Sequence, residues 1–309
     1  MLGLPCHKQM SIVIAFKLRS LARSHATKAS HVLQYTLKPT FSSEVSQAGS
    51  SRSAMPPAAK PEAPKPMKVL LYSDLHVEFA PFQPPEVEVD LVVLAGDIGI
   101  QARGVLWANE TFKSKVIYCA GNHEHYKGNI DRTVEKMKAA AAANVHVMEN
   151  ESLIVGNVRF LVATAWTDFS STGDAVAASM TCAREMNDFK MIRADANYRR
   201  LRPTDVIAKN AGSKDFLNRE LSKPFPGKTF VVTHHCPIAE VAGDEHGGHV
   251  SAAYFNAWNR LVEQADYWAF GHTHHSFDGV LGGCRLLSNQ RGYPQEECGF
   301  DPCKIIEIA

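Results

Sequence analysis

The chain has 309 residues, of which 45% are hydrophobic, and a net charge of +1 at pH 7. This length allows one large domain or two ordinary ones, and the composition is typical of a soluble globular protein. The seven cysteines are scattered without a CxxC pair, which argues against a disulfide framework and favours a reducing compartment. No run approaches the roughly 20 apolar residues that a membrane-spanning helix needs.

Residues 1–66 differ in charge from the rest of the chain. They hold nine Lys or Arg and two Glu, a net charge of +7, against −6 for residues 67–309. Residues 1–43 lack Asp and Glu, as organellar transit peptides do, and five prolines in residues 54–66 indicate a linker. We predict a disordered basic leader and linker over residues 1–66 and one domain over 67–309. A cytoplasmic location is favoured; an organellar location, or a true start at Met67, is the alternative.

After the linker, strands and helices alternate. Buried-strand patterns predict strands over residues 68–73, 90–95 and 115–119. Asp131 is expected to cap a helix over residues 132–143. Further strands are expected at residues 145–148 and 158–164, with Gly156-Asn157 as the turn between them. The remaining expected elements are a helix-like segment at 174–222, a strand at 228–232, a helix from Ser251 to Glu263, and strands at 267–270, 284–287 and 305–308.

Five short polar motifs follow predicted strands. In open α/β sheets, ligands bind beyond the carboxyl ends of the strands. Five strand ends that meet at one edge would therefore bring these motifs together. They are Asp74-Leu75-His76, Gly96-Asp97, Gly121-Asn122-His123-Glu124, His234-His235 and Gly271-His272-Thr273-His274.

The motifs supply carboxylate, amide and imidazole groups, which are the ligands of a dinuclear hydrolytic site. On extended backbone, Asp74 and His76 would face the same way and reach one ion. The two oxygens of Asp97 suit a bridge between two cations, and the mixed ligands favour Mn, Fe or Zn over Ca or Mg. Two ions about 3.5–4 Å apart clamp an in-line displacement and turn a bridging water into hydroxide. His123, next to Asn122, is placed to protonate the leaving oxygen as general acid.

In this order the motifs resemble the calcineurin-like metallophosphoesterase superfamily, over residues 68 to about 290. The resemblance implies an α/β fold, namely a four-layer α/β/β/α sandwich of two mixed sheets with flanking helices, in place of a single open sheet. It also implies His123 as general acid. Its metal ligands would be Asp74, His76, Asp97 and His274 for the first ion, and Asp97, Asn122, His234 and His272 for the second.

One departure from the family pattern narrows the resemblance. Many members continue GDxxD, whereas this chain reads Gly96-Asp97-Ile98-Gly99. It therefore does not resemble the protein Ser/Thr phosphatase branch. It is similar to compact bacterial-type members of unassigned substrate, which carry segments like Trp166-Thr167-Asp168, Asn187-Asp188 and Arg291-Gly292-Tyr293.

We therefore predict a metallophosphoesterase, either a phosphomonoesterase or a phosphodiesterase, that acts on a small phosphorylated substrate with two divalent ions such as manganese. The alternatives are a nuclease or cyclic-nucleotide phosphodiesterase of the same superfamily, or a catalytically silent binding scaffold. The acidic body carries no strong nucleic-acid signature. The candidate substrate-binding residues are His125, Trp166, Asp168 and Arg291, each with a purely structural role as the alternative. Nothing in the sequence indicates the oligomeric state.

Overall fold

The computed structural model describes residues 65–244 and 247–309. The predicted leader and nearly all of the predicted linker lie outside the described residues, so their assignment stays a prediction. The first described strand, β1 (Met67–Tyr72), begins at Met67. None of the described helices combines the length and apolar character needed to cross a membrane.

The first sheet has five strands in the order β13-β1-β2-β3-β4. Strands β1 to β4 run parallel, and β13 pairs antiparallel with β1. Apolar and β-branched residues fill these strands, and every residue of β2 is buried, as expected for a sheet covered on both faces. The strands after β1 are β2 (Leu91–Ala95), β3 (Lys115–Cys119), β4 (Val145–Met148) and β13 (Ile305–Ile308).

The second sheet has six strands in the order β11-β12-β10-β9-β6-β5. Its four central strands are parallel, and both edge strands are antiparallel to their neighbours. The carboxyl ends of the central strands therefore share one edge of the sheet. The strands are β5 (Glu151–Val155), β6 (Val158–Ala163), β9 (Lys228–Thr233), β10 (Tyr267–Ala269), β11 (Phe277–Leu281) and β12 (Cys284–Ser288).

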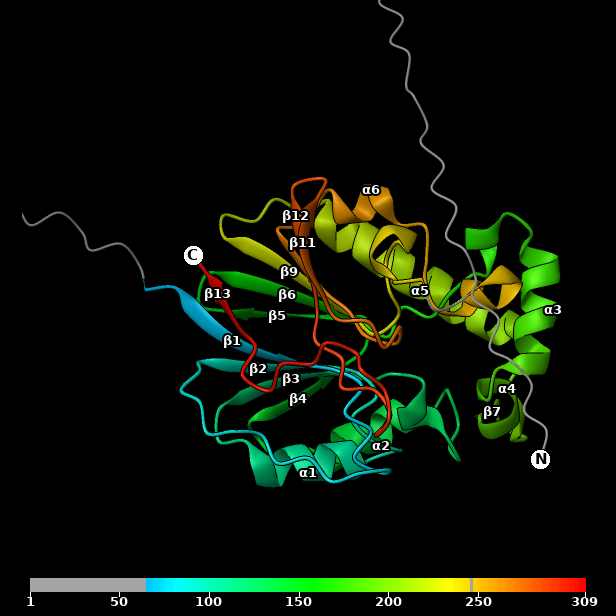
Figure 1. Cartoon of the computed structure of the whole chain (residues 1–309), viewed down its shortest axis with the longest axis horizontal. Helices are drawn as coiled ribbons and strands as arrows, with labels where there is room; N and C mark the ends of the chain where they lie inside the picture. Colours follow the sequence, from blue (N-terminus) through cyan, green and yellow to red (C-terminus); the bar gives the residue numbers. More distant parts are fainter. Residues whose placement is uncertain (1–64, 245–246) are drawn as a thin grey trace, which may run out of the picture. The chain divides into compact units, whose positions relative to one another are not determined.

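The two sheets pack face to face, and helices cover both outer faces (Figure 1). One apolar cluster fills the space between the sheets. A second lies between the first sheet and helices α1 (Arg103–Thr111) and α2 (Thr133–Ala140). A third lies between the second sheet and helices α5 (Pro203–Leu221) and α6 (Asn259–Val262). This architecture confirms the predicted four-layer sandwich of two mixed sheets.

A smaller cluster supports the segment that crosses one end of the sandwich. This segment contains helices α3 (Ala175–Glu185) and α4 (Asp188–Met191) and the short hairpin of β7 (Arg193–Ala194) and β8 (Arg199–Arg200). Single-turn 3₁₀ helices lie at His123–His125, Ser170–Thr172 and Ala239–Val241, and a longer one at Gly248–Ala253.

Several predicted elements are wrong in detail. The helix from Ser251 to Glu263 is interrupted, because Asn256 bonds through its backbone to Cys236 and through its side chain to the Trp166 carbonyl. These tertiary bonds outweigh the helical periodicity, so only α6 and the 3₁₀ turn at Gly248–Ala253 form. Helix α2 begins after Arg132 without a side-chain cap and ends at Ala140, so Asp131 is not its cap.

Candidate metal centre

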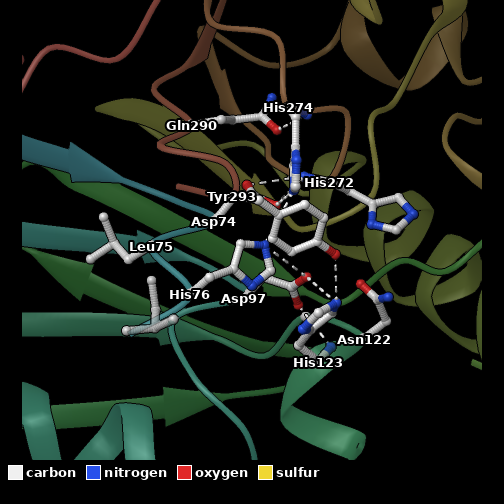
Figure 2. A network of polar contacts seen from close by, with 12 residues as sticks. Asp74, Leu75, His76, Asp97, Asn122, His123, His272, His274, Gln290 and Tyr293 are labelled. Carbon is white, nitrogen blue, oxygen red and sulfur yellow. Dashed lines mark hydrogen bonds and ion pairs between the residues drawn. The ribbon is translucent and has the colours of Figure 1, made fainter. Parts of the chain in front are cut away.

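The predicted ligands follow the carboxyl ends of parallel strands from both sheets. The motifs come after β1, β2 and β3 in the first sheet and after β9 and β10 in the second. Their side chains converge at one edge of the sandwich (Figure 2). All except His274 are at most 6% exposed. The structure thus brings together all seven predicted ligands, namely Asp74, His76, Asp97, Asn122, His234, His272 and His274.

Three motif glycines allow this close approach. A Cβ at Gly96 would collide with the His234 imidazole, and one at Gly121 would collide with the Asp97 carboxylate. A Cβ at Gly271 would lie 2.5 Å from Asp74 Oδ2. Each glycine therefore leaves room for a ligand that belongs to another motif.

The ligand loops adopt an unusual backbone conformation. Left-handed backbone costs non-glycine residues of order 1 kcal/mol or more and gathers at functional sites. In the ligand loops φ is positive, at 50° for Asp74, 45° for His76, 54° for Asp97, 72° for His272 and 52° for His274. The extended backbone assumed for the Asp74-Leu75-His76 motif is therefore wrong, although both side chains reach the same cluster.

The buried carboxylate of Glu124 joins two of these loops. Its Oε2 accepts hydrogen bonds from the backbone N–H of Asp97 at 3.0 Å and of Gly121 at 2.7 Å. Its Oε1 accepts from the Tyr118 hydroxyl and from two further backbone N–H groups of residues 98 and 99. Since all five neighbours donate, the ionised carboxylate is the form that satisfies them. Glu124 thus fixes the loop after β2 against the loop after β3.

The ligand atoms form two groups that meet at Asp97. Donor atoms of Asp74, His76 and His274 lie within 4.8 Å of one another, and so do those of Asp97, His234 and His272. Asn122 Oδ1 lies 2.9 Å from His234 Nε2 and so joins the second group. A third group, His76, Glu78 and His123, shares His76 with the first.

The charges of the site fit divalent cations. Burial lowers the pKa of His76 to about 4 and that of His234 well below its ordinary value, so both imidazoles are neutral and able to ligate metal. Burial raises the pKa of Asp74 to about 6. Burial, with the nearby Glu124 and Asp74 carboxylates, raises that of Asp97 well above its ordinary value. A cation would relieve this crowding of buried negative charge.

His123 lies beside His76 and Asp97 and is held by two residues that were not predicted. Glu78 Oε1 lies 3.0 Å from His123 Nδ1. The Tyr293 hydroxyl lies 3.2 Å from Nε2 (Figure 2). Burial opposes ionisation of Glu78, but hydrogen bonds from His123 and His76 outweigh it and lower its pKa to about 2. Glu78 follows Asp74 by four residues, and Tyr293 belongs to the late Arg-Gly-Tyr segment from which only Arg291 was chosen.

A pocket of about 290 Å³ opens over the centre. Ligands and His123 line its floor. Its walls are formed by residues other than the four predicted to bind substrate. They include Tyr126, Glu185, Met186, Asn187, Tyr254, Tyr293 and Glu296.

The four predicted substrate residues do not line this pocket. Arg291 instead donates to the backbone carbonyls of Leu75, Ala80 and Pro81, so its guanidinium holds the loop after β1. Asp168 accepts from Ser170 in a local turn. The rings of His125 and Trp166 pack against each other at 5.6 Å in the buried interior. The four side chains thus make their contacts outside this pocket, and their role in substrate binding stays a prediction.

Residues 67–276 match the family model of calcineurin-like phosphoesterases. The chain belongs to this family. The match confirms the resemblance inferred from the five motifs and covers all seven ligand candidates. Members of this family use divalent metal ions, and the donor groups described above are able to bind them.

Two known proteins illustrate the similarity. "Uncharacterized protein L509" of Acanthamoeba polyphaga mimivirus is 25% identical over 281 residues, which cover 78% of this chain and 97% of the viral protein. The solved structure of Phosphopantetheinyl Hydrolase (PptH) from Mycobacterium tuberculosis aligns with a TM-score of 0.59 and 16% identity, over 79% of this chain and 96% of that one. At this identity the second match shows the shared fold alone.

Proposed function

We propose that this phosphoesterase holds two divalent cations and hydrolyses a small phosphorylated substrate. The observation that carries the proposal is the position of Asp97. Its Oδ2 lies 3.9 Å from His76 Nε2, and its Oδ1 lies 3.4 Å from His234 Nε2. Each oxygen faces one donor group, as a bridging carboxylate requires. One ion would take Asp74, His76, Asp97 and His274, and the other would take Asp97, Asn122, His234 and His272.

The imidazole-rich ligand set favours Mn, Fe or Zn over Ca or Mg, and manganese is the first ion to test. Two such cations would lower the pKa of a water molecule and neutralise charge on the phosphoryl oxygens. The second donor group includes the neutral Asn122 amide, which adds an oxygen ligand without adding charge.

His123 supplies the proton that the leaving oxygen needs. The Glu78 carboxylate accepts from Nδ1, which fixes the imidazole so that Nε2 faces the pocket. Nε2–H donates its proton to the ester oxygen as the P–O bond breaks, and the product alcohol leaves neutral. The imidazole then regains a proton from solvent, and no covalent phosphoenzyme forms.

Hydrolysis of p-nitrophenyl phosphate and bis-p-nitrophenyl phosphate tests this proposal, with Mn²⁺ and with excess chelator. We expect activity with Mn²⁺, two metal ions per chain by elemental analysis, and loss of both in Asp97→Ala. His123→Ala should keep the metal and lose about 10²–10⁴-fold in kcat. Asp168→Asn, outside the pocket, is the control and should behave as wild type. Full activity in excess chelator or in Asp97→Ala would refute the proposal. Metal binding without turnover would favour a catalytically silent binding scaffold.

A further inference from the structure

A second pocket, of about 510 Å³, adjoins the one over the metal centre. The two pockets share His123, Tyr126, Asn187 and Tyr293. None of the seven metal-ligand candidates lines the second pocket. It therefore begins at the general acid and extends away from the metal centre.

The walls of this second pocket are mainly aromatic. Phe79 is 58% exposed, although its ring contacts that of Tyr293 at 5.3 Å in a perpendicular arrangement. Tyr126 stacks on His123 with ring centroids 4.2 Å apart. Met191 and Pro294 complete the apolar lining. We call Phe79, Tyr126, Met191 and Tyr293 the aromatic groove. Exposed aromatic rings that stand at right angles offer one face and one edge to a planar ligand.

The charges around the groove select against anionic groups. No Lys or Arg among the described residues lines either pocket. Glu185 and Glu296 line the pocket over the metal centre, beside the groove. Without the cations that bind extra phosphates, a nucleoside polyphosphate or a nucleic-acid strand would meet like charge here.

We propose that the aromatic groove binds the leaving group of the substrate. This leaving group is a neutral, planar aromatic alcohol, and the substrate is its phosphoester with a single phosphate. The inference rests on the proposed function, because it places the phosphoryl group over the metal centre. In an in-line displacement the leaving oxygen lies opposite the attacking water. His123 must reach that oxygen, so the group attached to it extends past His123 into the groove. Phe79 and Tyr293 would then pack against its ring.

A pair of aryl phosphates whose leaving groups have similar acidity tests this specificity. We expect wild type with Mn²⁺ to prefer 2-naphthyl phosphate over phenyl phosphate by about tenfold in kcat/KM, since the larger ring buries more apolar area. Phe79→Ala should reduce this ratio to about one. The matched control is Tyr198→Ala, which removes a 45% exposed aromatic ring outside both pockets and should keep the ratio. An unchanged ratio in Phe79→Ala, or a preference for oligonucleotides or nucleoside triphosphates, would overturn the proposal.

Binding of 2-naphthol, followed by its fluorescence, separates this proposal from the proposed function. The alcohol carries no phosphate, so its binding requires neither turnover nor metal. We expect saturable binding in Mn²⁺ and in chelator that is weakened at least fivefold in Phe79→Ala and unchanged in Tyr198→Ala. Naphthol binding without any phosphoester hydrolysis would retain the groove and refute the hydrolase. Hydrolysis without naphthol binding would retain the hydrolase and refute the groove.

Discussion

Replacement of Glu124 by Gln should destabilise the protein far more than its single-atom change suggests. Oε2 accepts two backbone N–H groups, and Oε1 accepts two more and the Tyr118 hydroxyl. In either orientation the new NH₂ group faces at least two donors. Each buried donor left without an acceptor costs about 1–3 kcal/mol, so the expected loss is about 4 kcal/mol. For a domain of this size that loss lowers Tm by about 8–16 °C.

Glu149→Gln is the matched control for this prediction. Glu149 accepts from the Thr164 backbone and hydroxyl, but both donors reach the same oxygen, Oε2. A glutamine can present its carbonyl oxygen there and keep both bonds, so Tm should fall by less than about 3 °C.

Thermal unfolding of both variants without metal, followed by titration with Mn²⁺, is the measurement. We also expect Glu124→Gln to bind Mn²⁺ about 10–100-fold more weakly, because Glu124 holds the Asp97 loop. Equal Tm losses in the two variants would refute the reasoning that the paired loops depend on this carboxylate.

Three further predictions concern residues around the site and beyond it. Gly121→Ala should abolish Mn²⁺ binding measured by calorimetry, because the added Cβ would collide with the Asp97 carboxylate. Gly212 lies in α5, where an added Cβ meets nothing within 4 Å. Gly212→Ala should therefore raise the unfolding free energy by about 0.5–1 kcal/mol. Arg291→Met removes the hydrogen bonds of Arg291 to backbone carbonyls and should lower the free energy of unfolding in urea by about 2–4 kcal/mol. KM for p-nitrophenyl phosphate should change less than threefold. A tenfold rise in KM would instead show that Arg291 binds the phosphate. Hydrogen bonds from Arg199 hold the pKa of Asp205 below its ordinary value, so this pair stabilises the fold above about pH 4 and loses its effect as pH falls further. Asp205→Asn should therefore be up to about 1 kcal/mol less stable than wild type at pH 7 and equally stable near pH 2, as measured by urea unfolding at each pH.

The strands that carry the motifs could be predicted because each combines a short buried run with a polar end. Strands β3, β4 and β13 have the predicted bounds. The edge strands β5 and β11 were missed, because most of their side chains are partly or fully exposed and they lack a buried apolar run. Gly156-Asn157 is indeed a turn, but it joins β5 to β6 and not β4 to β6.

The substrate pocket could not be predicted from short-range pattern. Trp166 and Asp168 follow a strand as the ligands do, yet after β6 Trp166 is buried and Asp168 lies in a local turn, and neither lines the pocket. Glu185, Met186 and Asn187 line the pocket because α3 and α4 cross that end of the sandwich. No periodicity in the sequence indicates where such a crossing segment lies.

The convergence of the ligands depends on topology, whereas the orientation of their side chains depends on contacts between loops. Parallel strands order the motif ends along one edge whatever the loops do, and for that reason the set of residues that meet could be predicted. The loops then reach left-handed conformations that their side chains disfavour, held by bonds such as Asp74 N–H to the Gly96 carbonyl and His76 N–H to the Asp97 carbonyl. Each loop stabilises the conformation of the next, so the sequence of a single motif does not determine the conformation of its loop. The same dependence explains Glu78, whose carboxylate reaches His123 only because the loop after β1 turns sharply at His76.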